Sequence, residues 1–236
     1  MVDLDQLFAQ FRHMKVGVLG DVMLDTYMWG HVDRISPEAP VPVVLLDERE
    51  QRIGGAGNVA LNLQSLGASA YLISITGDDG EAKTLNKLLA EKNIDATYIV
   101  SSPQRITTNK TRIISRNQQM MRLDAEITAD LQPAEEDKLL QALHNFLITQ
   151  KPQVLILEDY NKGVLTERVI KEAIRLCQQH GVITAVDPKR KNFFAYTGVD
   201  IFKPNLKEVK DALNIIASGT DVAALNDIHE KLKAQL

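Results

Sequence analysis

Cysteine is almost absent from this chain of 236 residues; Cys177 is the single example, so no disulfide can form within the chain. A lone cysteine is typical of a reducing compartment, and the first residues carry acids without the apolar core of a secretion signal. The chain also lacks any uninterrupted apolar run near eighteen residues, so we expect no membrane-spanning helix. Together these absences predict a cytoplasmic protein.

An excess of basic charge is missing as well. The net charge of −4 gives no general attraction to nucleic acid or to an anionic membrane. The five histidines have no metal-ligand spacing, and the acids form no calcium-binding loop. We therefore expect neither nucleic acid nor membrane as a partner.

Apolar runs alternate with amphipathic helical patterns along most of the chain. The runs predict buried strands at 15–24, 70–77, 154–159, 182–188 and 199–205. Helical patterns occupy 58–66, 78–93, 133–150, 165–181, 206–216 and 221–236, and Cys177 falls on the apolar face of one of them. This order predicts an α/β fold, a single domain over 1–236 with a mostly parallel sheet and helices on both faces.

Two β-rich insertions depart from that rhythm, at about 25–47 and 97–125. The first contains three prolines within six residues, which is typical of an exposed or edge strand. The second alternates polar and apolar residues and has Asn117-Gln118 at a plausible hairpin tip. We expect the two insertions to form a small second sheet together.

A glycine-rich turn stands in the stretch "IGGAGNVALNLQSLGAS", residues 53–69. Its spacing, Gly55-x-Gly57-x-x-Ala60, matches the dinucleotide fingerprint, but that fingerprint requires a buried strand before the turn. The preceding residues, "LLDEREQRI", are mostly polar, which argues against a dinucleotide and hence against a nicotinamide-dependent oxidoreductase. The glycines either form only a tight loop into a helix, or let a ligand with hydroxyl or anionic groups approach the backbone.

The spacing of Gly54-Gly55, Asn58, Ala60, Gly67 and Gly77 resembles the first signature of the ribokinase-like carbohydrate kinases of the phosphofructokinase B type. Other segments are similar to the members of that family that phosphorylate D-glycero-D-manno-heptose 7-phosphate: "GDVMLDTYMWG", "RISPEAPVPVV", "TRIISRNQQMMRLD", "EDYNKG" and "DPKRKNF". The resemblance implies a ribokinase-like fold with a β lid that often forms a homodimer contact.

The resemblance also implies an activity. An ATP- and Mg²⁺-dependent kinase would phosphorylate the anomeric hydroxyl to give heptose 1,7-bisphosphate, on the route to ADP-heptose and the lipopolysaccharide core. Another phosphosugar kinase of the family, or a remnant that binds a phosphosugar without turnover, are the alternatives.

By resemblance, the sugar hydroxyls would be held by Asp25, Asn58 and the backbone at Gly54 and Gly55. A carboxylate and an amide make paired hydrogen bonds to adjacent hydroxyls, although an aspartate such as Asp25 also commonly caps a loop. The substrate phosphate needs fixed positive charge, and the second insertion supplies Lys110, Arg112, Arg116 and Arg122. Even-numbered residues of one strand share a face if no bulge intervenes, although such arginines also commonly protect an edge strand.

Three successive strand ends carry polar residues where open α/β sheets place their ligands. Asp159 and Lys162 follow the first strand and are expected in the substrate site. For the nucleotide, the resemblance implies Asp187 and Lys189, with Lys189 at the triphosphate, and Asn205 and Glu208 as an N-x-x-E element that orders Mg²⁺ and phosphate through water. Asn205 and Glu208 also fit a helix capping box, and both roles are compatible.

The second signature of the family, a D-T-x-G-A-G-D run that supplies the general base and the anion hole, does not occur in this sequence. "SGTDVAAL", residues 218–225, is a faint echo of it. We therefore expect the chain to be the amino-terminal two-thirds of a kinase and inactive alone. Such a piece would also expose an unpaired sheet edge and apolar surface.

Overall fold

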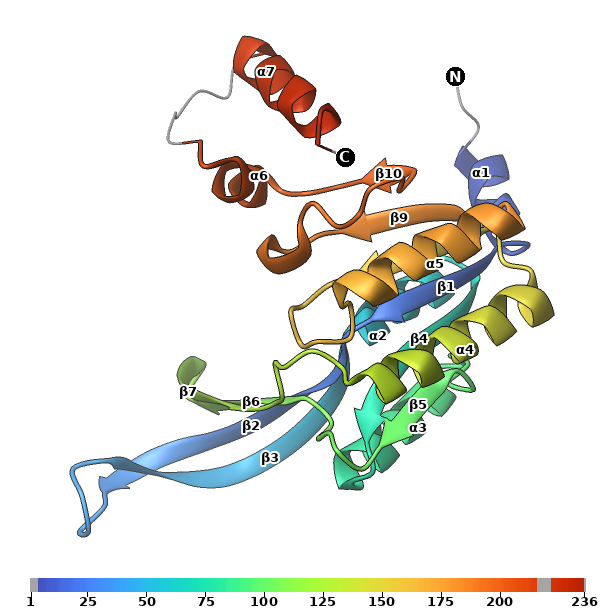
Figure 1. Cartoon of the computed structure of the whole chain (residues 1–236). Helices are drawn as coiled ribbons and strands as arrows, with labels where there is room; N and C mark the ends of the chain where they lie inside the picture. Colours follow the sequence, from blue (N-terminus) through green and yellow to red (C-terminus); the bar gives the residue numbers. More distant parts are fainter. Residues whose placement is uncertain (1–3, 216–221, 236) are drawn as a thin grey trace.

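The computed structural model describes residues 4–215 and 222–235. Its main sheet has six strands, all paired in parallel, in the order β10-β9-β8-β1-β4-β5 (Figure 1). The strands are β1 (Lys15–Gly20), β4 (Ser69–Gly77), β5 (Ile99–Ser102), β8 (Val154–Glu158), β9 (Ile183–Asp187) and β10 (Ile201–Phe202). The predicted parallel α/β sheet is confirmed.

Helices cover both faces of this sheet because successive strand residues point to opposite sides. Val18 and Leu72 face α2 (Ala56–Ser65) and α3 (Gly80–Glu91) in one core. The next residues along these strands, Leu19 and Ile73, face α4 (Pro133–Gln150) and α5 (Glu167–His180) in the other, which also buries Cys177 as predicted. The remaining helices are α1 (Leu4–Phe11), a short 3₁₀ turn (Arg190–Asn192), α6 (Leu206–Leu213) and α7 (Val222–Lys233). Within the described residues, no helix has the length and apolarity needed to cross a bilayer.

A second sheet of four strands projects away from the main one, at the lower left of Figure 1. Its order is β3-β2-β6-β7, from β3 (Pro42–Gly55), β2 (Val22–Ile35), β6 (Asn109–Ser115) and β7 (Gln118–Ala125). We call it the lid sheet. The two insertions therefore meet in one sheet, as expected, but the boundaries differ: 22–55 contributes two long strands, and the start of the second insertion is β5 of the main sheet.

The predicted single strand at 15–24 is wrong. β1 ends at Gly20 and β2 begins at Val22, so Asp21 is the joint at which the chain passes from one sheet to the other. The buried carboxylate of Asp21 accepts backbone N–H groups from Tyr160 (2.8 Å), Lys162 (3.1 Å) and Val164 (3.1 Å). These bonds hold the joint against the loop that follows β8.

The far edge of the main sheet is formed by β10, whose one strand partner among the described residues is β9. Ile201 on this edge strand and Ile183 on β9 are exposed. Exposed apolar surface was expected at such an edge.

Candidate functional site

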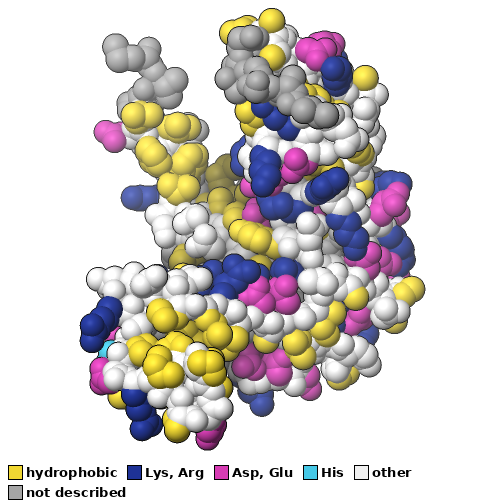
Figure 2. All heavy atoms as spheres, turned by 90° about the vertical axis from the view of Figure 1, so that its left-hand side faces the viewer, with side chains coloured by type: hydrophobic (Ala, Val, Ile, Leu, Met, Phe, Trp, Pro, Cys, Tyr) yellow, Lys and Arg dark blue, Asp and Glu magenta, His cyan; other side chains and the backbone are white. Residues whose placement is uncertain are grey.

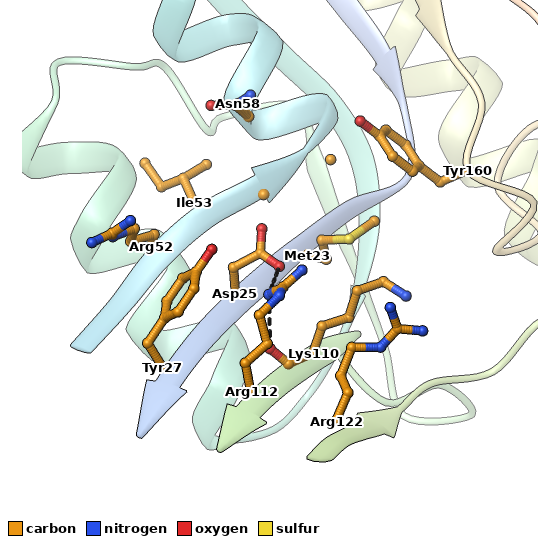
Figure 3. A pocket seen from close by; sticks show the side chains of 12 residues that line it. Met23, Asp25, Tyr27, Arg52, Ile53, Asn58, Lys110, Arg112, Arg122 and Tyr160 are labelled. Carbon is orange, nitrogen blue, oxygen red and sulfur yellow. Dashed lines mark hydrogen bonds and ion pairs between the residues drawn. The ribbon is translucent and has the colours of Figure 1, made fainter. Parts of the chain in front are cut away.

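A pocket of about 550 Å³ opens where the lid sheet leaves the main sheet (Figure 3). The pocket lies beyond the carboxyl end of β1, which has β4 on one side and β8 on the other. Open parallel sheets bind ligands at a position of this kind. Four cationic side chains and a single carboxylate lie among the residues that line the pocket: Met23, Asp25, Tyr27, Arg52, Ile53, Gly54, Gly55, Asn58, Lys110, Arg112, Arg122 and Tyr160.

The glycine turn forms one wall of the pocket. Gly55 has a φ of 58°, and a Cβ there would lie 2.2 Å from the carbonyl oxygen of Asp21, so only glycine fits. At Gly54 a Cβ would lie 2.3 Å from Oδ2 of Asp25. The turn thus brings backbone, Asn58 and the Asp25 carboxylate to one place, and it also makes the tight entry into α2.

A strand does lead into this turn, but before Ile53 it is not buried, in agreement with the polar sequence. β3 runs to Gly55, but it is antiparallel to β2 and belongs to the lid sheet. The dinucleotide fingerprint needs a buried strand of the parallel sheet at this place, so the sheet to which β3 belongs adds to the argument against a dinucleotide.

The centre of the pocket holds an ion pair between neighbouring strands. The Arg112 guanidinium on β6 donates to Oδ1 of Asp25 on β2 at 2.6 Å. The Tyr27 ring lies 5.2 Å from the Arg112 guanidinium and 4.6 Å from that of Arg52, so it positions both cations. Tyr27 and Arg52 were not predicted; the alternation from Asp25 to Tyr27 on one strand face was the available signal.

A chain of alternating charges runs along one side of the pocket. Arg122 binds Asp124 with two hydrogen bonds, and the Lys110 ammonium lies between Asp124 (3.4 Å) and Glu126 (3.3 Å). Lys162 binds the other oxygen of Glu126 at 2.7 Å, which ties the lid sheet to the loop after β8.

Both carboxylates of this chain have a pKa below the ordinary value. For Asp124 the main cause is the hydrogen bond from Arg122. For Glu126, burial acts to raise the pKa, but the hydrogen bond from Lys162 and the charge of Lys110 outweigh it. Both groups therefore stay ionised, and each remains bound to its cations at neutral pH.

Arg116 is not brought to this pocket. It forms the two-residue turn between β6 and β7 with Asn117, at φ values of 47° and 67°, the left-handed conformation of a type I′ hairpin. The predicted tip at Asn117-Gln118 was one residue late. The bulge in this hairpin lies on β7, where Met120 has no cross-strand partner on β6, so it leaves the alternation along β6 intact. Arg116 is separated from the other cations, contrary to the predicted grouping, because it lies in the turn after Ser115, the last residue of β6.

Asp159 is buried and does not line the pocket. Its carboxylate accepts the backbone N–H of Asn161 at 2.7 Å and the hydroxyl of Tyr196 at 3.0 Å. Burial raises its pKa although these hydrogen bonds oppose the rise. With Asp21 it fixes the loop that presents Tyr160 and Lys162, so the observed contacts of Asp159 support the site rather than meet a ligand.

A second polar cluster lies at the carboxyl ends of β8 and β9. The Lys189 ammonium contacts Glu208 at 2.7 Å and Asp187 at 3.1 Å. The side chains of Asn205 and Glu208 form a reciprocal capping box at the start of α6, so the capping role is present. Burial acts to lower the pKa of Lys189, but its two carboxylate partners raise it overall.

Glu158 belongs to the same cluster and was not predicted. It is 8 % exposed and pairs in register with Asp187 on β9. Burial raises its pKa to about 7; the Asp187 charge adds to the rise, while Lys189 and Lys203 oppose it. Its position as the last residue of a buried strand was the only signal in the sequence.

The side chains around Lys189 suit a Mg²⁺ ion that keeps its water ligands and is bound together with a phosphate. They suit a metal ion held directly by protein ligands less well. Carboxylate oxygens are ligands that Mg²⁺ prefers, and an ammonium suits phosphate oxygens. Among the described residues, no three histidine, cysteine or acidic side chains gather closely enough to hold a metal ion.

Known proteins resemble this chain over most of its length. It is 43 % identical to bifunctional protein HldE of Methylobacillus flagellatus over 214 residues, which is 90 % of this chain and 44 % of that protein. For bifunctional protein HldE of Caulobacter sp. strain K31, the identity is 42 % over 222 residues, 94 % of this chain and 44 % of that protein. The chain thus spans less than half the length of these relatives.

Solved structures show the same fold at low identity. Phosphofructokinase-2 from Escherichia coli in complex with fructose-6-phosphate has a TM-score of 0.71 at 18 % identity, over 94 % of this chain and 71 % of that one. Arabidopsis thaliana ribokinase complexed with ribose and ATP has a TM-score of 0.67 at 13 % identity, over 94 % and 69 %. The fold is therefore ribokinase-like, and the pfkB family carbohydrate kinase model matches residues 14–236. On this match and on the relatives above, the chain belongs to the pfkB family of carbohydrate kinases.

Proposed function

We propose that this chain carries the sugar-binding part of an ATP-dependent kinase that phosphorylates the anomeric hydroxyl of D-glycero-D-manno-heptose 7-phosphate. The observation that carries the proposal is the composition of the pocket: one carboxylate, one amide and a glycine turn on one side, and lid cations on the other. A phosphorylated sugar has the matching chemistry, because hydroxyls pair with carboxylate and amide oxygens and phosphate pairs with guanidinium.

The residues divide the binding work between them. Asp25 accepts hydrogen bonds from sugar hydroxyls while Arg112 fixes the orientation of its carboxylate. Asn58 adds a donor and an acceptor, and Gly54 and Gly55 let the sugar reach the backbone. Lys110 and Arg122 supply charge for the substrate phosphate, and Lys162 holds the Glu126 side of the lid in place.

For the second substrate, we assign Lys189 to the triphosphate and the carboxylates of Asp187 and Glu208 to Mg²⁺ through water, with Asn205 keeping Glu208 oriented by the capping box. When bound, ATP would supply the phosphoryl group, and Mg²⁺ would neutralise the negative charge of that group during transfer. One carboxylate oxygen of Glu208 contacts Lys189 and the other accepts the backbone N–H of Asn205. Both oxygens are thus engaged, so we assign Glu208 to contact Mg²⁺ through water rather than directly.

The chain alone is expected to bind the sugar without turnover. Its sequence has no D-T-x-G-A-G-D run to supply a general base. The faint echo of that run at 218–225 begins outside the described residues, and its last four residues begin α7. Phosphoryl transfer depends on positioning and on charge stabilisation, and a missing base and anion hole remove much of both.

A homodimer through the lid completes the proposal. The lid face opposite the pocket carries exposed Leu46, Met121 and Leu123, which register pairing places on one side of the sheet. Figure 2 views this end of the molecule and shows hydrophobic side chains gathered over the lid. A second lid of the same sequence would cover this apolar face.

Thermal-shift screening of the purified protein tests the proposal, because a ligand that binds the folded state raises the melting temperature. Heptose 7-phosphate should stabilise the protein more than fructose 6-phosphate or glucose 6-phosphate, with and without Mg²⁺·ATP. A coupled assay should detect no ADP formation from the 236-residue chain. Equal shifts with all three sugar phosphates would show that the site binds phosphosugars in general rather than the heptose. Measured turnover would overturn the prediction that the chain alone is inactive.

A further inference from the structure

Two cations that line the pocket converge on one carboxylate of the chain itself. Arg122 donates to Asp124 from Nε at 2.8 Å and from a terminal nitrogen at 2.9 Å, and the Lys110 ammonium lies 3.4 Å from the same carboxylate. Figure 3 shows the ends of Lys110 and Arg122 close together on one side of the pocket. A planar fork combined with an ammonium is also the donor set that binds a phosphate group.

The register of the lid sheet adds a second observation. Arg112 on β6 and Arg122 on β7 are direct cross-strand partners, so two guanidinium groups project from opposed positions on the pocket face. Like charges directly opposite one another destabilise a sheet. Asp25 and Asp124 relieve this repulsion, one for each arginine, and an anionic ligand would do the same.

We infer that Asp124 is an internal anion that occupies the phosphate subsite and that the substrate phosphate replaces it on Arg122 and Lys110. The inference rests on the proposed function, because it takes a phosphosugar as the ligand. A phosphate dianion has more charge and more acceptor oxygens than a carboxylate, and therefore displaces it. An unphosphorylated sugar leaves Asp124 bound to both cations. Asp124 thereby neutralises the two cations until a phosphate binds, and it lowers the affinity of the subsite for phosphate.

The remaining pocket arginines fit this subsite less well. Arg112 is committed to Asp25, on the sugar side of the pocket. Arg52 is held by both oxygens of Glu50, two residues away on its own strand, and no second pocket-lining cation contacts Glu50 in the described structure. Only at Asp124, among these described pairs, do two pocket cations share one anion.

Binding of phosphorylated and dephosphorylated ligand to three cation variants tests the subsite. Arg122→Gln and Lys110→Met should each weaken heptose 7-phosphate binding at least tenfold in calorimetry, and leave binding of dephosphorylated heptose within threefold. Arg49→Gln is the matched control, because Arg49 is exposed on β3 and pairs with Met28 on the lid face opposite the pocket. Thermal melts establish that each variant is folded.

Asp124→Asn separates an internal competitor from a residue that merely positions the cations. If Asp124 competes, the variant binds inorganic phosphate about tenfold more tightly than the unmodified protein. If phosphate affinity instead falls as it does in Arg122→Gln, the competitor role is overturned.

The two proposals fail in different ways. Unchanged heptose 7-phosphate binding in Arg122→Gln and Lys110→Met refutes the subsite and leaves the kinase proposal standing. Binding of inorganic phosphate that depends on Arg122, without any binding of heptose 7-phosphate, supports the subsite and refutes the heptose substrate.

Discussion

Arg112 and Asp25 form an ion pair of 2.6 Å between neighbouring strands of the lid sheet, at the centre of the pocket. The two side chains are about equally exposed, at 23 % and 21 %, so the pair is accessible to a ligand. Because Arg112 takes one oxygen of the carboxylate, the other oxygen remains available to sugar hydroxyls.

Asp25→Asn should therefore weaken sugar binding by roughly tenfold to a hundredfold, since hydrogen bonds to a charged group contribute about 1.5–3 kcal/mol. Calorimetry with heptose 7-phosphate measures the loss. Asp33→Asn is the control, because Asp33 lies on the same strand and is exposed beside His31, outside the pocket. Equal affinities of the two variants would show that Asp25 does not contact the sugar.

Gly54→Ala should reduce sugar binding through Asp25. The added Cβ would stand 2.3 Å from Oδ2 of Asp25, so the carboxylate must shift away from the position in which it now faces the pocket. Gly80→Ala is the matched control, because a Cβ at the first residue of α3 meets nothing within 4 Å. We expect at least a tenfold loss of affinity for Gly54→Ala alone; a similar small change in both variants would contradict the prediction.

Asp21→Ala should destabilise the fold. Three backbone N–H groups lose their acceptor in a buried environment, where each unsatisfied donor costs about 1–3 kcal/mol. Relief of the buried charge offsets part of this cost, since burial raises the pKa of Asp21. We expect a net loss of about 3 kcal/mol in the free energy of unfolding, measured by urea denaturation. Asp137→Ala, which removes an exposed carboxylate, should change it by less than about 1 kcal/mol.

The joint at Asp21 also shows where sequence reasoning stops. Most strands of the main sheet were predictable because buried parallel strands are apolar on both faces, but β5 was assigned to the second insertion. α4 was predicted with its bounds because Pro133 begins it. The division of the apolar run at Asp21 was not. The donors that fix the Asp21 carboxylate are the backbone N–H groups of Tyr160, Lys162 and Val164, well over a hundred residues away.

The lid sheet was predictable in kind but not in detail. The polar run before Gly54 forms the strand β3 although it has no apolar alternation. A strand exposed on both faces needs none, because pairing with β2 holds it in place. Arg52 was therefore missed. Arg116 was misplaced for a related reason: the end of β6 at Ser115 depends on cross-strand pairing, which sets the turn at Arg116-Asn117 rather than one residue later.

Stability should depend on pH through Glu158. Burial raises the pKa of Glu158 from 4.5 to about 7, so the folded state favours the protonated form. The stability that this group contributes is complete below pH 4.5 and is lost as the pH rises through 7. Glu158→Gln keeps a neutral side chain at every pH. As the pH rises from 5 to 8.5, the free energy of unfolding of this variant should gain up to about 3 kcal/mol relative to that of the unmodified protein, since one pKa unit corresponds to about 1.4 kcal/mol.

Urea denaturation at both pH values measures this difference. Burial also raises the pKa of Asp21 and of Asp159, so the unmodified protein has a slope with contributions from all three carboxyls. Comparison with Glu158→Gln isolates the share of Glu158. A stability difference that stays constant from pH 5 to pH 8.5 would falsify the assignment.

Leu123→Glu should convert a lid dimer into monomers. Leu123 is 52 % exposed on β7, beside Met121 on the lid face opposite the pocket, and a charge there would be buried against the second lid. Light scattering after gel filtration should give about half the mass of the unmodified protein. Ile148→Glu, an equally exposed apolar position on α4, should leave the mass unchanged. Because Leu123 points away from the pocket, the Leu123→Glu monomer should still bind heptose 7-phosphate; a monomeric unmodified protein would rule out the lid contact.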